Sequence, residues 1–397
     1  MSKIEELISK YCPNGVEYKS VGIVLRPLPK GTLKQDQLEK DGQYPVINSG
    51  RDFYGYYSLF NNDCEAIVIA SRGEYAGFIS YMSGKFWAGG LCYPYAVCDT
   101  SILLPKYVFY YLKSQEQYIM DTLVSRGSIP ALNKSDMDKF QVPVPPLPVQ
   151  EEIVKILDSF TELEAELEAE LEARKKQYEH YRDNLLNFAD VSDKNIWKPL
   201  GEVCEVTDYV ANGSFADLRK NVVYKNEPSF AVLIRLADFS SGFDENKFIF
   251  IDESAYEFLS KTKLYGGEII MSNIGSIGSL FKCPKLKYKM NLAPNTVMVK
   301  TPNNDFYYHY FKTKKFQSDL IKITSKSAMP KFNKTDLKKI LIPVPSLEEQ
   351  ERIVSILDRF DKLVNDISEG LPAEIKGRHQ QYEYYRNKLL DFQPIAE

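Results

Sequence analysis

The residues that could carry out chemistry are few, and their spacing matches no catalytic motif. Only three histidines occur, at positions 180, 309 and 379. The chain has no GxxxxGK[ST] loop to wrap phosphates, no GxGxxG after a strand, no HExxH metal-ligand pair and no Asn/Asp-Pro-Pro-aromatic motif of an amino-methyltransferase. Asp136 and Asp336 are best explained as residues that begin or cap a structural element. We therefore expect no catalytic residues and no metal site in this chain.

The cysteines indicate a reduced protein without a disulfide framework. They lie at positions 12, 64, 92, 98, 204 and 283, with no paired two-residue spacing that would suggest a zinc ribbon. We expect mostly buried thiols.

No run of 18 apolar residues occurs, and the first six residues, MSKIEE, lack the apolar core of a signal peptide. The sequence thus predicts a soluble, cytoplasmic protein that does not enter a membrane.

Positive charge is the one chemical feature that is concentrated. The whole chain carries 50 Lys+Arg against 54 Asp+Glu, a net charge of −4, which argues against a uniformly basic nucleic-acid binder. Residues 281–340, however, hold 14 Lys and 3 Asp with no Arg or Glu, a local net charge of +11. Phosphate binding is the natural interpretation of such a segment, and a solvated lysine-rich surface is the alternative.

The candidate nucleic-acid contacts are basic and polar residues of both halves. Arg72 and Arg126 each precede a glycine, so their loops could approach a groove closely. For each of them a surface salt bridge is an equally good explanation. The full set of candidates is Arg72, Lys85, Arg126, Ser128 and Lys134 in the first half and Asn273, Lys282, Lys285, Lys287, Lys326, Lys331 and Lys334 in the second.

The chain consists of two copies of one long unit. Residues 142–160, VPVPPLPVQEEIVKILDSF, match 342–360, IPVPSLEEQERIVSILDRF, at 12 of 19 positions. Residues 177–188, QYEHYRDNLLNF, match 381–392, QYEYYRNKLLDF, at 8 of 12. The alignment offset grows from 179 near the beginnings of the copies to 200 and then 204, so the second copy carries about 21 more residues in its front part.

Each copy has a mixed globular part and a long amphipathic helix. Short apolar runs such as 66–70 predict strands, whereas apolar residues three or four apart predict helices after residues 146 and 345. We divide the chain into a globular domain at 1–146, a spacer helix at 147–190, a second globular domain at 191–345 and a second helix at 346–397. Gly370, Pro372 and Gly377 should kink or interrupt the second helix.

The order of these parts predicts an α+β protein with pseudo-twofold symmetry. If the two long helices pair as an antiparallel coiled coil, they separate the two α/β domains and hold them at opposite ends. Two related but divergent domains at a fixed separation are what a reader of two unlike, spaced half-sites requires. Duplex DNA is the ligand that we expect for such a molecule.

The doubled motifs resemble a known family. The repeated Pro-Val-Pro-x-x-x-x-x-Gln-x-x-Ile-Val-x-Ile-Leu-Asp-x-Phe and Tyr-x-x-Tyr-Arg-x-x-Leu-Leu-x-Phe motifs are similar to those of the specificity subunits of type I restriction-modification systems, over essentially the whole chain. The resemblance implies two target-recognition domains, each reading one half of a bipartite, asymmetric site in double-stranded DNA. It also implies that the helices set the spacer between the half-sites.

The resemblance further implies the partners and their cofactors. Two methyltransferase subunits would dock on the helices and methylate adenine with S-adenosylmethionine. Two restriction subunits would cleave DNA using ATP and Mg²⁺, and no cofactor would bind this chain. Two other classes remain open: a coiled-coil scaffold whose globular ends bind proteins, and a nuclease or methyltransferase with an unrecognised site.

Overall fold

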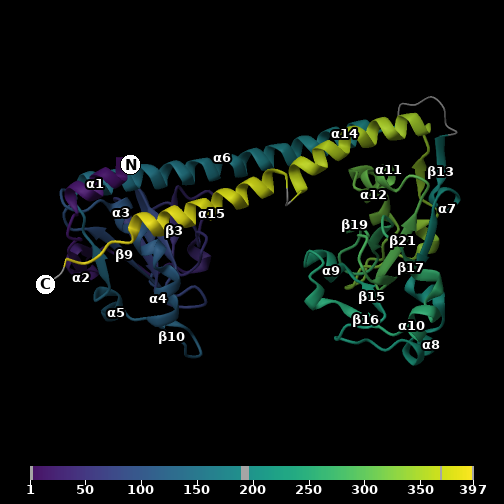
Figure 1. Cartoon of the computed structure of the whole chain (residues 1–397), viewed down its shortest axis with the longest axis horizontal. Coiled ribbons are helices and arrows are strands. Elements are labelled where there is room, and N and C mark those ends of the chain that lie inside the picture. The colour runs from purple at the N-terminus through teal and green to yellow at the C-terminus, as the bar shows by residue number, and fades with distance from the viewer. Residues whose placement is uncertain (1–2, 189–195, 367–368, 396–397) are drawn as a thin grey trace. The chain divides into compact units, whose positions relative to one another are not determined.

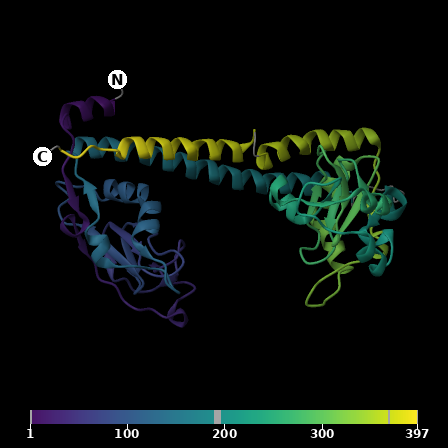
Figure 2. The ribbon, with the colours of Figure 1, turned by 60° about the horizontal axis from the view of Figure 1, so that its bottom comes forward.

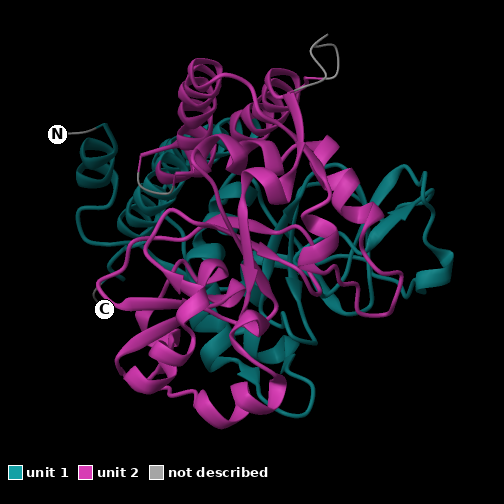
Figure 3. Ribbon diagram, turned by 90° about the vertical axis from the view of Figure 1, so that its right-hand side faces the viewer, with its two compact units in different colours: residues 1–169, 374–397 teal, residues 170–373 magenta. Residues whose placement is uncertain are grey.

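The computed structural model describes residues 3–188, 196–366 and 369–395, which form two compact units. Unit 1 comprises Met1–Ala169 and Glu374–Glu397, and unit 2 comprises Glu170–Ala373 (Figure 3). The four domain boundaries inferred from the sequence remain a prediction, because this grouping assigns parts of the long helices to each unit. In the described part of the chain, every helix is too short or too polar to cross a membrane.

Unit 1 is built on two four-stranded sheets (Figure 1). The first has strand order β2-β9-β6-β7, antiparallel throughout, and its central strand β6, AIVIA, is completely buried. The second has order β4-β3-β8-β5, with β3 parallel to β8. The elements are α1 (Lys3–Tyr11), β1 (Tyr18–Ser20), α2 (Val21–Val24), β2 (Leu25–Pro27), η1 (Gln35–Gln37), β3 (Tyr44–Ile47), β4 (Gly55–Tyr57), β5 (Asn62–Asp63), β6 (Ala66–Ala70), β7 (Ile79–Met82), β8 (Lys85–Ala88), β9 (Cys92–Val97), α3 (Pro105–Ser114), α4 (Glu116–Thr122), β10 (Val124–Ser125), β11 (Ala131–Leu132), α5 (Lys134–Asp138), β12 (Gln141–Pro143) and α6 (Leu147–Leu185).

Unit 2 repeats the same topology with sheets β14-β21-β18-β19 and β16-β15-β20-β17, in which β15 is again parallel to β20. The tandem repeat expected from the sequence is therefore confirmed in both four-stranded sheets. The elements are β13 (Trp197–Pro199), α7 (Leu200–Val203), β14 (Glu205–Asp208), η3 (Tyr209–Asn212), α8 (Phe215–Asn221), β15 (Ala231–Ile234), α9 (Leu236–Ser240), η4 (Glu245–Lys247), β16 (Ile249–Ile251), α10 (Glu253–Phe258), η5 (Ser260–Thr262), β17 (Lys263–Leu264), β18 (Ile269–Ser272), β19 (Leu280–Lys282), β20 (Lys289–Leu292), β21 (Thr296–Lys300), α11 (Asn304–Phe311), α12 (Lys314–Lys322), α13 (Lys334–Leu337), β22 (Leu341–Pro343) and α14 (Leu347–Asn365).

The extra residues of the second copy lie mainly in connections between strands. The connection from β14 to β15 contains η3 and α8, whereas the equivalent residues 28–43 of unit 1 contain only the short η1. The connection from β15 to β16 contains α9 and η4, and the one from β16 to β17 contains α10 and η5. The two units therefore share one sheet framework and differ in the loops and short helices that it carries.

The long helices supply one helix pair to each unit. In unit 1 the first part of α6 lies beside α15 (Leu371–Leu390) in both Figure 1 and Figure 2. There the ring of Phe160 stacks on Tyr385 at 5.5 Å between centroids, and Glu164 contacts His379, so the two helices run antiparallel. In unit 2 the repeat-related rings Phe360 of α14 and Tyr181 of α6 stack, also at 5.5 Å.

The second long helix is interrupted where the sequence predicted a break. Helix α14 begins at Leu347 and ends at Asn365; the hydroxyl of Ser346, directly before it, accepts a hydrogen bond from the Glu349 N–H at 3.3 Å. Helix α15 begins at Leu371, directly after Gly370. Gly377 lies inside α15 and does not break it. The prediction of an interruption is therefore confirmed at Gly370–Pro372 only.

A buried glutamine explains why the Pro-rich turn and the following helix recur together. Gln150 is completely buried at the start of α6. Its side-chain oxygen accepts from the Leu104 N–H at 2.8 Å, and its amide donates to the carbonyl groups of Ile102 and Pro145 at 2.8 and 2.6 Å. Gln350 likewise donates to the Pro345 carbonyl at 2.9 Å. Each glutamine satisfies backbone groups that would otherwise be buried without a partner.

The cysteines largely follow the expectation from the sequence. All six are free thiols, and Cys12, Cys92, Cys204 and Cys283 are buried. Burial raises the pKa of Cys92, Cys204 and Cys283 to about 12, so these thiols are protonated and unreactive at neutral pH. Cys98 is exposed.

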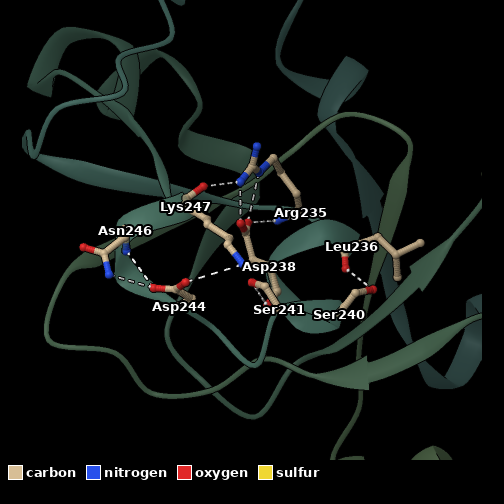
Figure 4. A network of polar contacts seen from close by, with 8 residues as sticks. All are labelled: Arg235, Leu236, Asp238, Ser240, Ser241, Asp244, Asn246 and Lys247. Atoms are coloured by element: carbon tan, nitrogen blue, oxygen red, sulfur yellow. Dashed lines mark hydrogen bonds and ion pairs between the residues drawn. The ribbon is translucent and has the colours of Figure 1, made fainter. Parts of the chain in front are cut away.

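A buried ion pair organises the connection between β15 and β16 (Figure 4). Asp238 is completely buried, and its carboxylate accepts hydrogen bonds from the Arg235 backbone N–H at 2.8 Å and from the Arg235 guanidinium at 2.5 and 3.1 Å. The same guanidinium donates to the Lys247 carbonyl at 2.6 Å. Arg235 therefore joins the beginning of α9 to the end of η4.

Replacing Asp238 should destabilise unit 2 strongly. The Asp238→Ala variant removes the acceptor for three hydrogen bonds and leaves the guanidinium of Arg235 only partly solvated, so we expect a loss on the order of 3 kcal/mol in the free energy of unfolding. Urea denaturation followed by circular dichroism measures this loss. The control is Glu227→Ala, an exposed position without an ion pair among the described residues, where the change should stay within about 0.5 kcal/mol. Equal denaturation midpoints for both variants would contradict the role given to Asp238.

Candidate nucleic-acid interface

Most lysines of the basic segment 281–340 are already paired with acids. Among the described residues, eight of its 14 lysines form an ion pair. Several of the acids, including Asp208, Glu245 and Asp361, lie outside the segment, so they were not counted in its local charge of +11. The six lysines without an ion pair to any described residue are Lys285, Lys289, Lys300, Lys326, Lys331 and Lys338.

Two of the predicted contacts, Lys282 and Lys287, belong to the paired group. Lys282 of β19 donates to Asp305 of α11 at 2.9 Å. Burial lowers and this hydrogen bond raises the pKa of Lys282, with a net rise above its usual value. Lys287 donates to Glu245 at 2.7 Å, and this bond raises the pKa of the lysine and lowers that of the glutamate. Their charge is compensated in the absence of a ligand.

Other predicted contacts are brought together at an equivalent place in each unit, which we call the hairpin corner. It has two segments. The first follows β6 in unit 1, at residues 71–73, and β18 in unit 2, at residues 273–275. The second packs against the first and comprises residues 124–132 in unit 1 and 324–332 in unit 2. In unit 1 the Leu132 N–H donates to the Ser71 carbonyl and the Gly73 N–H to the Pro130 carbonyl, both at 2.9 Å. In unit 2 the Phe332 N–H donates to the Asn273 carbonyl and the Gly275 N–H to the Pro330 carbonyl, both at 3.2 Å.

Each hairpin corner carries one exposed cation at the backbone bridge that joins its two segments. The cation belongs to the first segment in unit 1 and to the second segment in unit 2. In unit 1 Arg72 forms an antiparallel bridge with Ala131, and in unit 2 Ile274 forms the same bridge with Lys331. Arg72 and Lys331 are exposed, and neither side chain has an ion-pair partner among the described residues. Gly73 and Gly275 next to this bridge have φ of +97° and +78°, a left-handed conformation that glycine adopts without strain, so they allow the chain to turn here.

The tips of the two hairpin corners are also alike. Arg126 and Lys326 occupy the same repeat position; Arg126 contacts Asp121 at 3.0 Å in a highly exposed pair, and Lys326 is exposed without such a partner in the described chain. Ser128 is exposed at the tip in unit 1. Ile129 and Met329 follow as exposed apolar residues, 52% and 67% accessible. The tip thus combines a cation with a hydrophobic side chain, a combination that suits insertion into a DNA groove.

The remaining predicted contacts lie apart from the tips. Lys134 and Lys334 follow the corner at the first positions of α5 and α13, where they contact Asp138 at 2.7 Å and Asp208 at 2.8 Å. Lys85 begins β8 and lies over the ring of Phe60 at 4.7 Å. Lys285 is exposed and lies beside Gly266.

Sequence reasoning missed the exposed aromatic residues near the candidate contacts. In unit 1 they follow β3, at Phe53, Tyr54, Tyr56 and Phe60, and in unit 2 they include Phe215 and Tyr224. Composition gives no signal for them, because an aromatic residue in a loop and one in a core look alike in a single sequence. The aromatic residues among the lysines, by contrast, pack in cores: Tyr307, Tyr308, Tyr310 and Phe311 are buried, and Tyr288 is partly buried against a core cluster.

No cluster of three or more His, Cys, Asp or Glu side chains able to hold a metal ion is present in the described residues.

His309, the one buried histidine among the described residues, is held between helices. Its ring contacts the Tyr178 hydroxyl at 3.0 Å and Asp358 at 2.7 Å. The hydrogen bond from His309 holds the pKa of Asp358 below its usual value. This arrangement joins α6, α11 and α14 and is structural.

A known family model matches both copies of the repeat. The model, described as the type I restriction modification DNA specificity domain, matches residues 14–173 and 196–377. The chain is 31% identical over 372 residues to a type I restriction enzyme specificity subunit of Escherichia coli, with 88% of this chain and 87% of the relative covered. It is 32% identical over 359 residues to a putative type I specificity subunit of Mycoplasma pneumoniae, with 85% and 97% covered.

Solved structures share the fold. The type I restriction-modification S subunit from M. genitalium aligns with a TM-score of 0.58 at 17% identity, over 95% of this chain and 97% of that chain. A chain from a structural study of complex assembly in the type I system aligns with a TM-score of 0.59 at 14% identity, over 95% and 98%. With the repeated sheets and the long helix α6, these likenesses confirm the expected α+β tandem fold.

Proposed function

Because the chain belongs to the type I restriction-modification DNA specificity family, we propose that each unit reads one half of a bipartite, asymmetric site in double-stranded DNA. The observation that carries this proposal is the hairpin corner, which recurs in both units with an exposed cation at the same bridge, Arg72 or Lys331, that has no ion pair in the described parts of the chain. The surrounding loops differ between the units, which accounts for two unlike half-sites. Phosphate contacts from the cations position each unit, and loop side chains contact the base edges.

In the same proposal, this chain provides recognition and its partners provide chemistry. Two methyltransferase subunits dock on the helices, whose exposed side chains include Tyr181, Leu363, Tyr384 and Tyr385. They methylate adenine with S-adenosylmethionine, and two restriction subunits use ATP and Mg²⁺ for cleavage. The chain itself binds none of these cofactors and acts in the cytoplasm, where the DNA is.

The decisive experiment is methylome sequencing. The chain is co-expressed with the methyltransferase and restriction subunits of its own genome, and the host DNA is sequenced by a single-molecule method that detects methylated bases. A bipartite methylated motif that disappears when this chain is omitted supports the proposal. A stable complex that binds no DNA would instead support the scaffold function, and methylation by the purified chain alone would show an unrecognised active site.

The unpaired lysines should matter more for DNA binding than the paired ones. The Lys326→Gln, Lys331→Gln double variant removes two free cations, so the slope of log K against log salt should fall by about 1.8, at 0.9 per lost phosphate contact. The matched control is Lys282→Gln, Lys287→Gln, which also removes two positive charges but from existing ion pairs, and it should change the slope by less. Measurements use the complex with the methyltransferase subunits. A larger effect of the control pair would place the phosphate contacts on the paired lysines.

We also propose that the length of α6 sets the spacer. The helix runs without a break through residues 163–173, LEAELEAELEA, an acidic four-residue repeat in which most glutamates are exposed, as on a solvated helix face. Deleting residues 163–166 shortens the helix by ~6 Å, close to two base-pair rises of ~3.4 Å. The methylated motif should keep both half-sites and acquire a shorter spacer. As a control, Glu166→Gln, Glu168→Gln keeps the length and should keep the spacer. An active deletion variant with the original spacer would refute the proposal.

A further inference from the structure

A pocket of about 530 Å³ lies in unit 2 between α8 and the hairpin corner. Its outer wall comes from the connection between β14 and β15, residues 209–224, and its inner wall from residues 273–274, 294–296 and 331–333. The outer wall includes η3 and α8, which have no helical counterpart beyond η1 in residues 28–43 of unit 1. The pocket is therefore a feature that the extra residues of the second copy add to the shared framework.

The pocket is apolar inside and aromatic at its edge. Leu218, Val222 and Phe332 are buried and form an apolar floor. Tyr209 is buried, and a hydrogen bond joins it to Tyr224. Desolvation by burial, together with this bond, raises the pKa of Tyr209. Phe215 lines the pocket although it is 74% exposed. Exposed aromatic rings around an apolar floor favour a flat ring as the ligand, because such a ring can stack.

One polar atom in the pocket is buried without a partner. The side-chain oxygen of Asn273 has no hydrogen bond within the described residues. The backbone of Asn273 is fixed on both sides, by its N–H to the Asn295 carbonyl and by its carbonyl to the Phe332 N–H, both at 3.2 Å. A buried acceptor without a partner is costly, and a ligand with an N–H donor removes that cost.

Three other polar side chains of the pocket wall are already engaged. Asp208 accepts from Lys334 at 2.8 Å, and Asn333 binds Asp336 through both its amide nitrogen and its oxygen. Thr296 donates to the Ala293 carbonyl at 2.8 Å, and Asn295, which also lines the pocket, is exposed. Asn273 thus carries the buried amide oxygen that is left to recognise a ligand, and an asparagine amide matches adenine in particular, because it can pair with N6 and N7 together.

Two free cations lie at the rim. Arg219 of α8 and Lys331 of the hairpin corner line the pocket, are exposed, and have no ion pair among the described residues. Their positions on opposite walls leave an uncompensated charge of +2 at the opening. A phosphate group attached to the bound ring would neutralise it.

We propose that this pocket binds a single nucleotide unit, with an adenine-type base against Asn273 and its phosphate at Arg219 and Lys331. Two sources supply this chemistry: a base turned out of the DNA duplex during recognition, and a free adenine nucleotide. The first source rests on the proposed DNA-binding function, and the second does not. Base extrusion into unit 2 would give this half-site a recognition mode that unit 1, with Ser71 at the position of Asn273, does not share.

The free-nucleotide source is tested by calorimetric titration of the full chain with adenosine monophosphate, thymidine monophosphate and inorganic phosphate. The proposal expects saturable binding of adenosine monophosphate, weaker binding of thymidine monophosphate and none of phosphate alone. Asn273→Leu should weaken adenosine monophosphate binding at least about fivefold. Asn273→Ser serves as a second variant, because unit 1 already folds with serine at this position. The control Asn226→Leu, at an exposed residue outside the pocket lining, should leave binding unchanged.

The extruded-base source is tested with the complex and a duplex carrying its methylated motif. Adenines of the half-sites are replaced one at a time by the fluorescent analogue 2-aminopurine, whose emission rises when it leaves the base stack. The proposal expects a rise at one position that Asn273→Ser removes. A rise that survives Asn273→Ser arises in the partner subunits and does not support the pocket.

The two arms separate the proposal from the proposed function. If the complex methylates a bipartite motif but neither arm responds to the Asn273 variants, the pocket proposal is overturned and the DNA-reading function stands. If adenosine monophosphate binds through Asn273 but the complex binds no DNA, the pocket proposal holds with a free nucleotide and the DNA-reading function falls. Equal binding of inorganic phosphate and adenosine monophosphate would reduce the site to its two cations and overturn the proposed base contact.

Discussion

Each unit completes its hydrophobic core with the last turns of a long helix, and the rest of the unit is arranged around that contact. In unit 2, Leu186 and Phe188 after α6 join the core of sheet β14-β21-β18-β19. In unit 1 the same positions of the repeat are Leu390 and Phe392, which come from the other end of the chain. The backbone of residue 394 then forms a parallel bridge with Val16, and the Tyr18 hydroxyl donates to the Phe392 carbonyl at 2.7 Å. Unit 1 cannot bury its core without the C-terminal helix, so the two ends of the chain fold together.

Electrostatic compensation decides which charges are available for a ligand. The local charge of +11 counts only the residues of the segment 281–340. In the folded chain, Asp208, Glu245 and Asp361 from outside the segment form ion pairs with its lysines and compensate part of this charge. Among the described residues, the cations without an ion pair include Arg72 and Lys331 at the hairpin corners and Arg219 at the pocket rim. A surface ion pair contributes little to stability and can exchange its partner for a phosphate, but that exchange releases less energy than a contact by a free cation.

The sequence predicted the parts of the fold that repeat or have a strong period. Local rules predict the doubled motifs, the helix after residue 146 and the interruption of the second long helix at Gly370, and the structure has them. The sequence could not predict that Arg72 and Lys331 take equivalent places at the bridge of the hairpin corner. In the repeat alignment Arg72 matches Ile274 and Lys331 matches Ala131, because the two cations lie on opposite segments of the bridge. Nor could it predict the pairing of Lys282 with Asp305 or the free oxygen of Asn273, since both depend on which elements pack together.

The distribution of the cysteines has a practical consequence for spectroscopy. Four thiols are shielded within the cores, and Cys64 is half-buried with its pKa raised by burial, whereas Cys98 at the end of β9 is exposed. A thiol-reactive fluorophore or spin label should therefore attach at Cys98 without any engineering of the chain. Since Cys98 belongs to unit 1, its signal would report on that half of the molecule.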